Sequence, residues 1–429
     1  MEIKRDRYLS KLISKKNNGL IKVITGIRRS GKSYLLFNLY HDYLVSLGVP
    51  ESNIIAIPLD DDGYLAYCDP HKLSEYIKGK TADKDQNYYV FIDEAQYAIT
   101  KEEMKNPDVP IRLYGVLNGL LRQKNVDVYV TGSNSKFLSS DIMTEFRGRG
   151  DEVPVEPLSF SEYYPASGKQ KDEAWNEYLY YGGLPHILAE PDAESKSNYL
   201  DKLNTEIYLK DICEHYDVKD EDGIKDLMKV IASSVGSLSN AQRISDTFKS
   251  NGIKNISMPT ISNYLRYLQE SFVIQKVERY DIKGRKYIST PAKYYYSDLG
   301  LRNALLNSRQ FEKTHLMENA IYNELFYRGY RVDVGVVEVR VNEDVMSRRK
   351  QLEVDFVVNQ ASKRYYIQSA YSLPDNAKLD QEQASLVRIP DSFKKIIVVS
   401  DNSPIWRTEQ GITVMGIFDF LLNPNSLDL

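Results

Sequence analysis

The sequence predicts an α/β protein with a parallel sheet and helices on both faces, followed by a helical region and a second α/β domain. Three observations support this prediction: recurrent apolar runs in the first third of the chain, amphipathic stretches between them, and further strand-like runs beyond residue 270. Alternation of strands and helices is typical of a parallel sheet. The first apolar runs lie at residues 20–25, 53–59, 88–92 and 126–130.

Composition argues against several classes of protein. Hydrophobic residues make up 42% of the 429-residue chain, and no run reaches the ~18 apolar residues of a membrane span. Residues 1–18 are charged and lack the apolar core of a signal peptide, so we expect a cytoplasmic protein without a membrane partner. The two cysteines and five histidines show no ligand-like spacing, which argues against structural zinc. A net charge of −4 permits only a local nucleic-acid-binding surface.

A glycine-rich motif follows the first apolar run. It is a full match to G-x-x-x-x-G-K-[ST], the Walker A phosphate loop. Its glycines let the backbone approach phosphate oxygens, and the amide groups at the start of the next helix attract anions. Lys32 adds a positive charge for the β and γ phosphates, and the Ser33 hydroxyl can bind Mg²⁺. We therefore predict that ATP and Mg²⁺ bind at Gly26, Ile27, Arg28, Arg29, Ser30, Gly31, Lys32, Ser33 and Tyr34.

Two carboxylates end the third apolar run. Asp93 and Glu94 follow residues 88–92, and the carboxyl ends of parallel strands are where ligands bind in such sheets. The pair is similar to a Walker B motif. We expect Asp93 to hold Mg²⁺ and Glu94 to orient or deprotonate the attacking water. The alternative is an ordinary solvated strand end.

Further short motifs accompany these two. They are Phe91–Glu94, Thr131–Ser133, Gly148–Arg149 and Pro157–Phe160, with Tyr181–Pro185 further along. Together with the Walker A loop, they resemble a prokaryotic AAA-type ATPase family whose members carry a C-terminal domain of unknown function. The resemblance covers the whole chain and implies ATP binding.

Three more residues are candidates for contact with the γ-phosphate. The resemblance implies that Ser133 or Asn134, after the fourth strand, occupies the sensor-1 position and orients the water or the γ-phosphate. A helix cap is the alternative for these two side chains. We also expect Arg149 to stabilise charge on the γ-phosphate, although a structural ion pair would equally explain an arginine there.

The middle of the chain predicts helices and then a winged helix-turn-helix. Residues 173–235 have a helical pattern, which we interpret as a lid over the nucleotide. Two helices, at 239–248 and 259–268, precede strand-like runs on either side of a basic tip. Asn263, Arg266 and Tyr267 would face a DNA groove, while Lys283, Arg285 and Lys286 would reach phosphates. A lid or a protein-docking module is the alternative.

The last part of the chain resembles a restriction-endonuclease-like domain. A helix at 316–325 precedes strands at 352–358 and 364–370, and Glu318 and Asp355 match two of the metal-binding carboxylates of that fold. Gln368 and Ala370 stand where the fold has a glutamate and a lysine, so the resemblance implies the fold without nuclease activity. We expect the polar residues after Phe420 to be frayed.

The sequence thus predicts an ATPase domain at 1–165, a helical lid and winged helix at 166–300, and an inactive nuclease-like domain at 301–429. The expected function is Mg²⁺-dependent ATP hydrolysis coupled to the C-terminal region. Alternatives are a slow nucleotide-dependent switch that binds double-stranded DNA or an unidentified protein, and a disfavoured metal-dependent nuclease.

Overall fold

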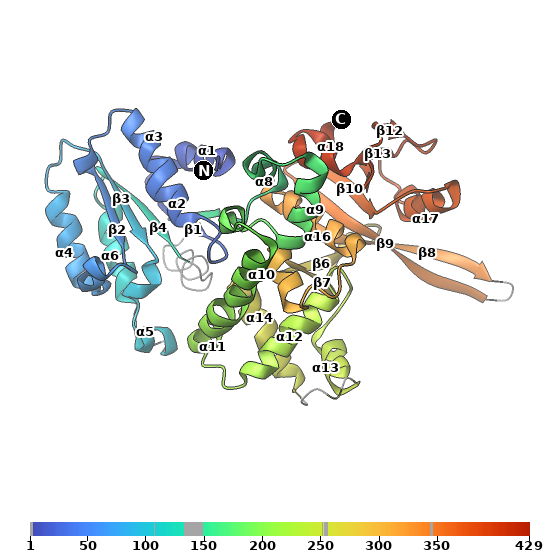
Figure 1. Cartoon of the computed structure of the whole chain (residues 1–429), viewed down its shortest axis with the longest axis horizontal. Helices are drawn as coiled ribbons and strands as arrows, with labels where there is room; N and C mark the ends of the chain where they lie inside the picture. Colours follow the sequence, from blue (N-terminus) through green and yellow to red (C-terminus); the bar gives the residue numbers. More distant parts are fainter. Residues whose placement is uncertain (1–2, 107, 133–148, 251, 253–255, 344–345) are drawn as a thin grey trace. The chain divides into compact units, whose positions relative to one another are not determined.

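The computed structural model describes residues 3–106, 108–132, 149–250, 252, 256–343 and 346–429 (Figure 1). It divides into two compact units. The first consists of Met1–Pro157 with the short segment Glu270–Phe272, and the second of Leu158–Gln269 and Val273–Leu429. No helix within these described residues is long and apolar enough to cross a membrane.

The first unit is built on a parallel sheet in the order β2-β3-β4-β1-β5. The four predicted strands are confirmed, and β5 adds a further edge strand beside β1. Most strand residues are buried, as expected when helices cover both faces of a parallel sheet. The strands are β1 (Ile21–Thr25), β2 (Ile54–Pro58), β3 (Tyr88–Asp93), β4 (Val126–Thr131) and β5 (Gly150–Pro154).

Helices of the first unit pack on the two faces of this sheet (Figure 1). Successive side chains of a strand point to opposite faces. Val90 and Val128 therefore pack with Leu117 of α6, whereas Phe91 and Tyr129 contact Tyr40 after the phosphate loop. The helices are α1 (Asp6–Lys15), α2 (Lys32–Tyr34), η1 (Leu35–Tyr40), α3 (His41–Ser46), η2 (Glu51–Asn53), η3 (Asp62–Cys68), α4 (Pro70–Lys80), η4 (Ala95–Ala98), α5 (Lys101–Lys105) and α6 (Arg112–Leu121).

A buried ion pair joins β1 to β4 near their amino ends. The Lys22 ammonium contacts the Asp127 carboxylate, and both side chains are buried. Asp127 also accepts hydrogen bonds from the Tyr129 hydroxyl at 2.7 Å and from the Asn17 amide at 2.9 Å. Burial lowers the pKa of Lys22, and Asp127 opposes that effect. The pair fixes the central strands at the end of the sheet away from the phosphate loop.

The second unit begins with helices, as the pattern at 173–235 predicts. Two further helices, α13 and α14, precede a hairpin and match the helix pair expected before the basic tip. The helices up to that hairpin are α8 (Phe160–Ser167), α9 (Lys171–Tyr181), η6 (Pro185–Ala189), α10 (Ala193–Lys202), η7 (Leu203–Leu209), α11 (Lys210–Tyr216), α12 (Glu221–Ser233), α13 (Ala241–Ser250) and α14 (Met258–Glu270).

A mixed sheet in the order β12-β13-β11-β10-β9-β8-β6-β7 forms the rest of the second unit. The predicted basic hairpin is confirmed as β6 and β7, but β6 also pairs in parallel with β8. Strands on both sides of the predicted boundary at residue 300 therefore share one sheet, and the three-domain division stays a prediction. The strands are β6 (Ile274–Asp281), β7 (Lys286–Tyr296), β8 (Arg331–Glu343), β9 (Met346–Gln360), β10 (Lys363–Ala370), β11 (Lys394–Val399), β12 (Trp406–Arg407) and β13 (Thr413–Gly416).

Helices also cover this second sheet. Val357, Tyr366 and Ile397 on one face form a core with Leu386 of α17. The long hairpin of β8 and β9 projects from the rest of the sheet in Figure 1. The helices are α15 (Leu299–Leu305), α16 (Lys313–Tyr327), α17 (Asn376–Val387), α18 (Ile417–Leu422) and η8 (Ser426–Asp428).

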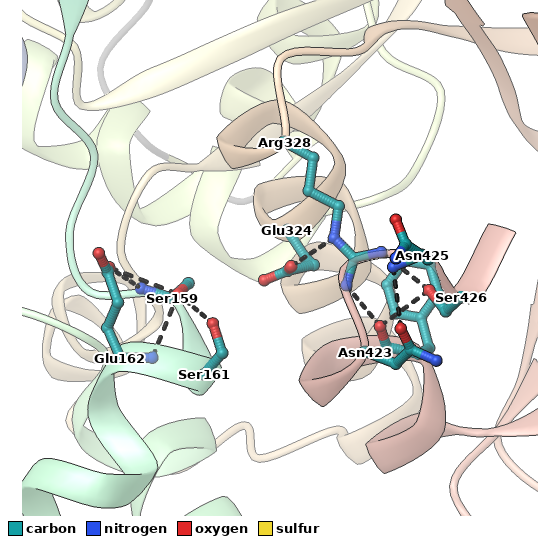
Figure 2. A network of polar contacts seen from close by, with 9 residues as sticks. Ser159, Ser161, Glu162, Glu324, Arg328, Asn423, Asn425 and Ser426 are labelled. Carbon is teal, nitrogen blue, oxygen red and sulfur yellow. Dashed lines mark hydrogen bonds and ion pairs between the residues drawn. The ribbon is translucent and has the colours of Figure 1, made fainter. Parts of the chain in front are cut away.

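The carboxyl end of the chain is anchored, so the expectation that it frays after Phe420 is wrong. The buried Arg328 guanidinium, at the end of α16, donates to the Glu324 carboxylate at 2.6 Å and to the Ser426 hydroxyl at 2.8 Å (Figure 2). Leu427 is only 1% exposed. Figure 2 also shows the reciprocal cap at the start of α8, where Ser159 and Glu162 exchange hydrogen bonds.

Removing one partner of the Lys22–Asp127 pair should destabilise the first unit strongly. Asp127→Ala leaves a buried ammonium without its anion, which costs about 3–5 kcal/mol. Asp151→Ala removes the more exposed pair with Lys15 and should cost less than about 1 kcal/mol. Urea unfolding followed by circular dichroism measures both losses. Equal losses in the two variants would contradict the structural role given to Asp127.

Candidate nucleotide site

The loop between β1 and α2 is shaped by left-handed backbone conformations. Gly26 has φ 135° and Gly31 has φ 94°, both in a region that side chains disfavour. A Cβ at Gly26 would lie only 2.2 Å from the backbone oxygen of Val155. Arg29 also has a positive φ, of 67°. Both glycines are thus required by this backbone, and Gly26 also by the close approach of Val155.

The loop encloses the Lys32 ammonium. The Lys32 side chain is nearly buried, and its Nζ donates to the backbone oxygens of Gly26 at 3.0 Å and Ile27 at 3.1 Å. Burial lowers the pKa of Lys32, while Glu94 and Asp93 act in the opposite direction. A buried ammonium with neutral acceptors is poorly compensated. This arrangement suits the arrival of an anion.

The other buried lysines differ from Lys32 in the partner of their ammonium group. Among the residues that the structure describes, four lysines are buried. Lys22, Lys196 and Lys293 each form an ion pair with a carboxylate, whereas Lys32 is hydrogen-bonded to two carbonyl groups. The anionic partner of Lys32 is therefore expected to come from a ligand.

Asp93 lies across the loop at the carboxyl end of β3. Its carboxylate accepts a hydrogen bond from the Thr131 hydroxyl, and the Ser33 hydroxyl lies near enough to act on its pKa. Burial raises the pKa of Asp93, and the hydroxyls of Thr131 and Ser33 oppose the increase. Because β4 lies between β1 and β3, Thr131 at the end of β4 sits beside both partners. The structure thus brings Ser33 and Asp93, the two predicted Mg²⁺ ligands, near one another.

Glu94 follows Asp93 in a strained conformation. Its φ of 49° is unusual for a residue other than glycine, and such strain is concentrated at functional sites. The Glu94 amide donates to the Thr131 hydroxyl at 3.0 Å, and the Gln96 amide group donates to the Glu94 carboxylate. Glu94 is half-buried. Its carboxylate is held next to the Lys32–Asp93 site by these contacts.

The start of the chain supports the loop from the other side. The buried Arg5 guanidinium donates to the backbone oxygens of Ser30 at 3.1 Å and Glu156 at 2.6 Å. Burial raises the pKa of Glu156 to about 7, against the opposing effect of Arg5, Lys11 and Lys32. Sequence reasoning did not select Arg5, Thr131 or Glu156 as site residues. Thr131 lies inside the Thr131–Ser133 motif, but no motif or spacing in the sequence indicates a functional role for Arg5 or Glu156.

The remaining predicted nucleotide contacts have different surroundings. Arg29 is exposed, Arg28 is half-buried, and Tyr34 is 38% exposed. The Ser30 hydroxyl is buried, and among the described residues no hydrogen-bond partner is found for it. Ser133 and Asn134 lie outside the residues that the structure describes, so their expected role stays a prediction.

Arg149 lies away from the phosphate loop of its own chain, so its expected action on a γ-phosphate stays a prediction. The register pairs Ile21 with Gly150, so Arg149 precedes β5 at the amino-terminal edge of the sheet. Its backbone oxygen accepts a hydrogen bond from the Ile21 amide. The phosphate loop follows the opposite end of β1, about five strand residues or roughly 16 Å away. Arg149 therefore does not reach a γ-phosphate bound at the loop of the same chain.

The side chains predicted to contact DNA in the second unit are only partly exposed. Asn263 and Arg266 lie on the exposed side of α14, but the Tyr267 ring stacks on Tyr216 with centroids 3.9 Å apart. A stacked ring is less available to a base. Exposed cations lie at the turn between β6 and β7, at Lys283, Arg285 and Lys286.

The acidic residues of the nuclease-like region are brought together. The Asp355 carboxylate on β9 accepts the Ser369 amide at 2.8 Å, and the Asp355 amide donates to the Gln368 side chain at 3.4 Å. Lys293, which sequence reasoning missed, forms an ion pair with Glu318 on α16. Burial and the nearby Glu318 raise the pKa of Asp355 to about 8, while Lys293 opposes this rise. In the described part of the chain, no group of three or more acidic, histidine or cysteine side chains is arranged to hold a metal ion.

The sequence of this chain is similar to two protein-domain families and to proteins that are uncharacterized. Residues 18–164 match the AAA domain, and residues 172–312 match a domain of unknown function, DUF8612. An uncharacterized protein of Haemophilus influenzae is 33% identical over 426 residues, covering 98% of both chains. A second, from Methanocaldococcus jannaschii, is 26% identical and covers 90% of this chain and 87% of its own.

A solved structure shows a more distant similarity. The Walker-type ATPase PABY2304 of Pyrococcus abyssi is 15% identical, covers 71% of this chain and 96% of its own, and gives a TM-score of 0.48. The domain match coincides with the unit that holds the phosphate loop, and the full-length relative extends over nearly the whole chain. The chain belongs to a family of prokaryotic AAA-type P-loop ATPases with a C-terminal domain of unknown function.

Proposed function

We propose that the protein binds Mg²⁺-ATP at the loop Gly26–Ser33 and hydrolyses it. The observation that carries the proposal is the Lys32 ammonium, which is buried and donates to two carbonyl groups, whereas the other buried lysines among the described residues each pair with a carboxylate. The triphosphate of ATP supplies that anion. Membership of an AAA-type family supports the nucleotide assignment.

The residues around Lys32 have separate roles in the proposed reaction. Ser33 and Asp93, which lie near one another, would hold Mg²⁺, which would neutralise charge on the β and γ phosphates. Glu94 would accept a proton from water as the water oxygen attacks the γ-phosphorus and the bond to the β-phosphate oxygen breaks. The products are ADP and inorganic phosphate. Thr131 and Gln96 touch the carboxylates and act as positioning residues.

Lys32→Ala should weaken ATP binding. The variant removes charge-assisted contacts to phosphate oxygens, and a loss of about 10- to 150-fold in affinity is expected. Calorimetric titration with Mg²⁺-ATP measures the loss, and Lys78→Ala, an exposed lysine of α4, is the matched control. Unchanged affinity in Lys32→Ala would place the nucleotide elsewhere.

Glu94→Gln should separate binding from turnover. The amide keeps the size of the side chain but cannot accept a proton, so kcat should fall by about 10²- to 10⁴-fold while ATP affinity is retained. Phosphate release under steady-state conditions measures this effect. Glu75→Gln, on the exposed side of α4, serves as the control. Wild-type turnover in Glu94→Gln would assign the base to another residue.

A second candidate function, nucleotide-dependent binding of double-stranded DNA, is favoured by the position of the β6–β7 turn. The Lys283 ammonium donates to the backbone oxygen of Glu338 at 3.1 Å, and Arg349 of β9 lies 3.8 Å from the Glu338 carboxylate. The turn is therefore held beside the projecting β8–β9 hairpin. Exposed cations of both segments gather around one acidic residue, and such a surface suits phosphate contacts.

Replacing Lys283, Arg285 and Lys286 together by alanine should weaken binding of duplex DNA and flatten its salt dependence. Each lost phosphate contact lowers the slope of log K against log salt by about 0.9. A matched variant replaces Lys72, Lys78 and Lys80 of α4, which are also exposed. An unaltered salt slope in the first variant would remove this turn from the interface. Steady-state ATP hydrolysis with and without DNA then distinguishes an ATPase from a slow switch.

A further inference from the structure

We propose that Lys293 is a built-in cation that occupies the acidic site of the second unit in place of a divalent metal ion. The cluster then links separate elements of the sheet and does not hydrolyse phosphodiesters. This inference is independent of nucleotide binding in the first unit.

The Lys293 ammonium lies at the centre of three carboxylates. Its Nζ is 2.9 Å from Glu318 Oε1, 2.7 Å from Glu353 Oε1 and 3.7 Å from Asp355 Oδ1. The Lys293 side chain is 3% exposed. An ammonium at these distances neutralises part of the acidic charge and fills the space toward which the carboxylates converge. In the described part of the chain the acidic side chains are not arranged to hold a metal ion while this lysine is present, and an ion could bind them together only after the lysine side chain had moved.

The partners of Lys293 come from elements that are not neighbours in the sheet. Lys293 lies on β7, whereas Glu353 and Asp355 lie on β9, and β6 and β8 stand between these strands in the sheet order. Glu318 comes from α16. The ion pairs therefore connect β7, β9 and α16, a link that backbone hydrogen bonds do not supply.

Two further internal donors reach the carboxylates of the cluster. The Tyr295 hydroxyl donates to Glu318 Oε1 at 2.6 Å, and the Ser369 amide donates to Asp355 Oδ2 at 2.8 Å. The backbone at Gly236 covers Glu318 closely, because a Cβ added there would lie 3.0 Å from Glu318 Oε1. Internal donors thus occupy one oxygen of Glu318 and one oxygen of Asp355 that a metal ion could otherwise use.

Exchanging Lys293 for a neutral side chain of similar length should turn the cluster into a metal site. The test measures the melting temperature (Tm) of nucleotide-free, full-length protein in EDTA and in millimolar Mn²⁺. We expect the Tm of wild type to be the same in both solutions. Lys293→Met should melt lower in EDTA, because like charges lose their shared cation, and Mn²⁺ should restore its Tm by about 5 °C.

The double variant Lys293→Met/Asp355→Asn is the matched control, and it should lose the Mn²⁺ effect. Recovery of Lys293→Met in soluble form only when Mn²⁺ is present would support the proposal equally. If this variant fails to fold in either solution, Mn²⁺ titration of wild type and Asp355→Asn by electron paramagnetic resonance decides. If wild type and Asp355→Asn bind equal numbers of Mn²⁺ ions, the result supports Lys293 as the cation of the cluster.

Three results would overturn the proposal. The first is Mn²⁺ stabilisation of wild type that depends on Asp355. The second is a bound ion that wild type holds and Asp355→Asn does not. The third is metal-dependent cleavage of DNA or RNA by wild type that disappears in Asp355→Ala, which would make Lys293 part of a nuclease site.

Discussion

A buried positive charge needs a negative partner, and this requirement governs both units of the protein. Lys22 pairs with Asp127 and Lys293 with Glu318, and both ammonium groups join elements far apart in the sequence. Lys32 is equally buried but is held by two carbonyl oxygens. Carboxylates of the protein thus offset the desolvation of Lys22 and Lys293. At Lys32, in the phosphate loop, we expect an anionic ligand to do so.

The order of strands explains why that ligand meets several functional groups at once. β4 lies between β1 and β3, so the loop after β1, Thr131 at the end of β4 and Asp93 at the end of β3 share one edge of the sheet. The Thr131 hydroxyl donates to Asp93 and accepts from the Glu94 amide. A single side chain therefore sets the positions of both acidic residues, and the Lys22–Asp127 pair fixes the opposite ends of the same central strands.

Local patterns predicted the first unit well, since strands of a parallel sheet are continuous apolar runs and the phosphate loop depends on consecutive residues. Properties that depend on register or on distant contacts were not predictable from such patterns. Arg149 follows a promising motif, but pairing of Ile21 with Gly150 puts it at the edge away from the phosphate loop of its own chain. Lys293 looked like an ordinary strand residue, because its carboxylate partners lie from 25 to about 60 residues further along the chain. The anchored carboxyl end likewise depends on Arg328, about 100 residues earlier.

The central claim is that the buried Lys32 ammonium pairs with the β- and γ-phosphates of a bound nucleotide. The most direct measurement is calorimetric titration of the wild-type chain with ADP and with AMP at the same Mg²⁺ concentration. Charge-assisted contacts to the β-phosphate predict that ADP binds at least about tenfold more tightly than AMP. Equal affinities for ADP and AMP would contradict the account.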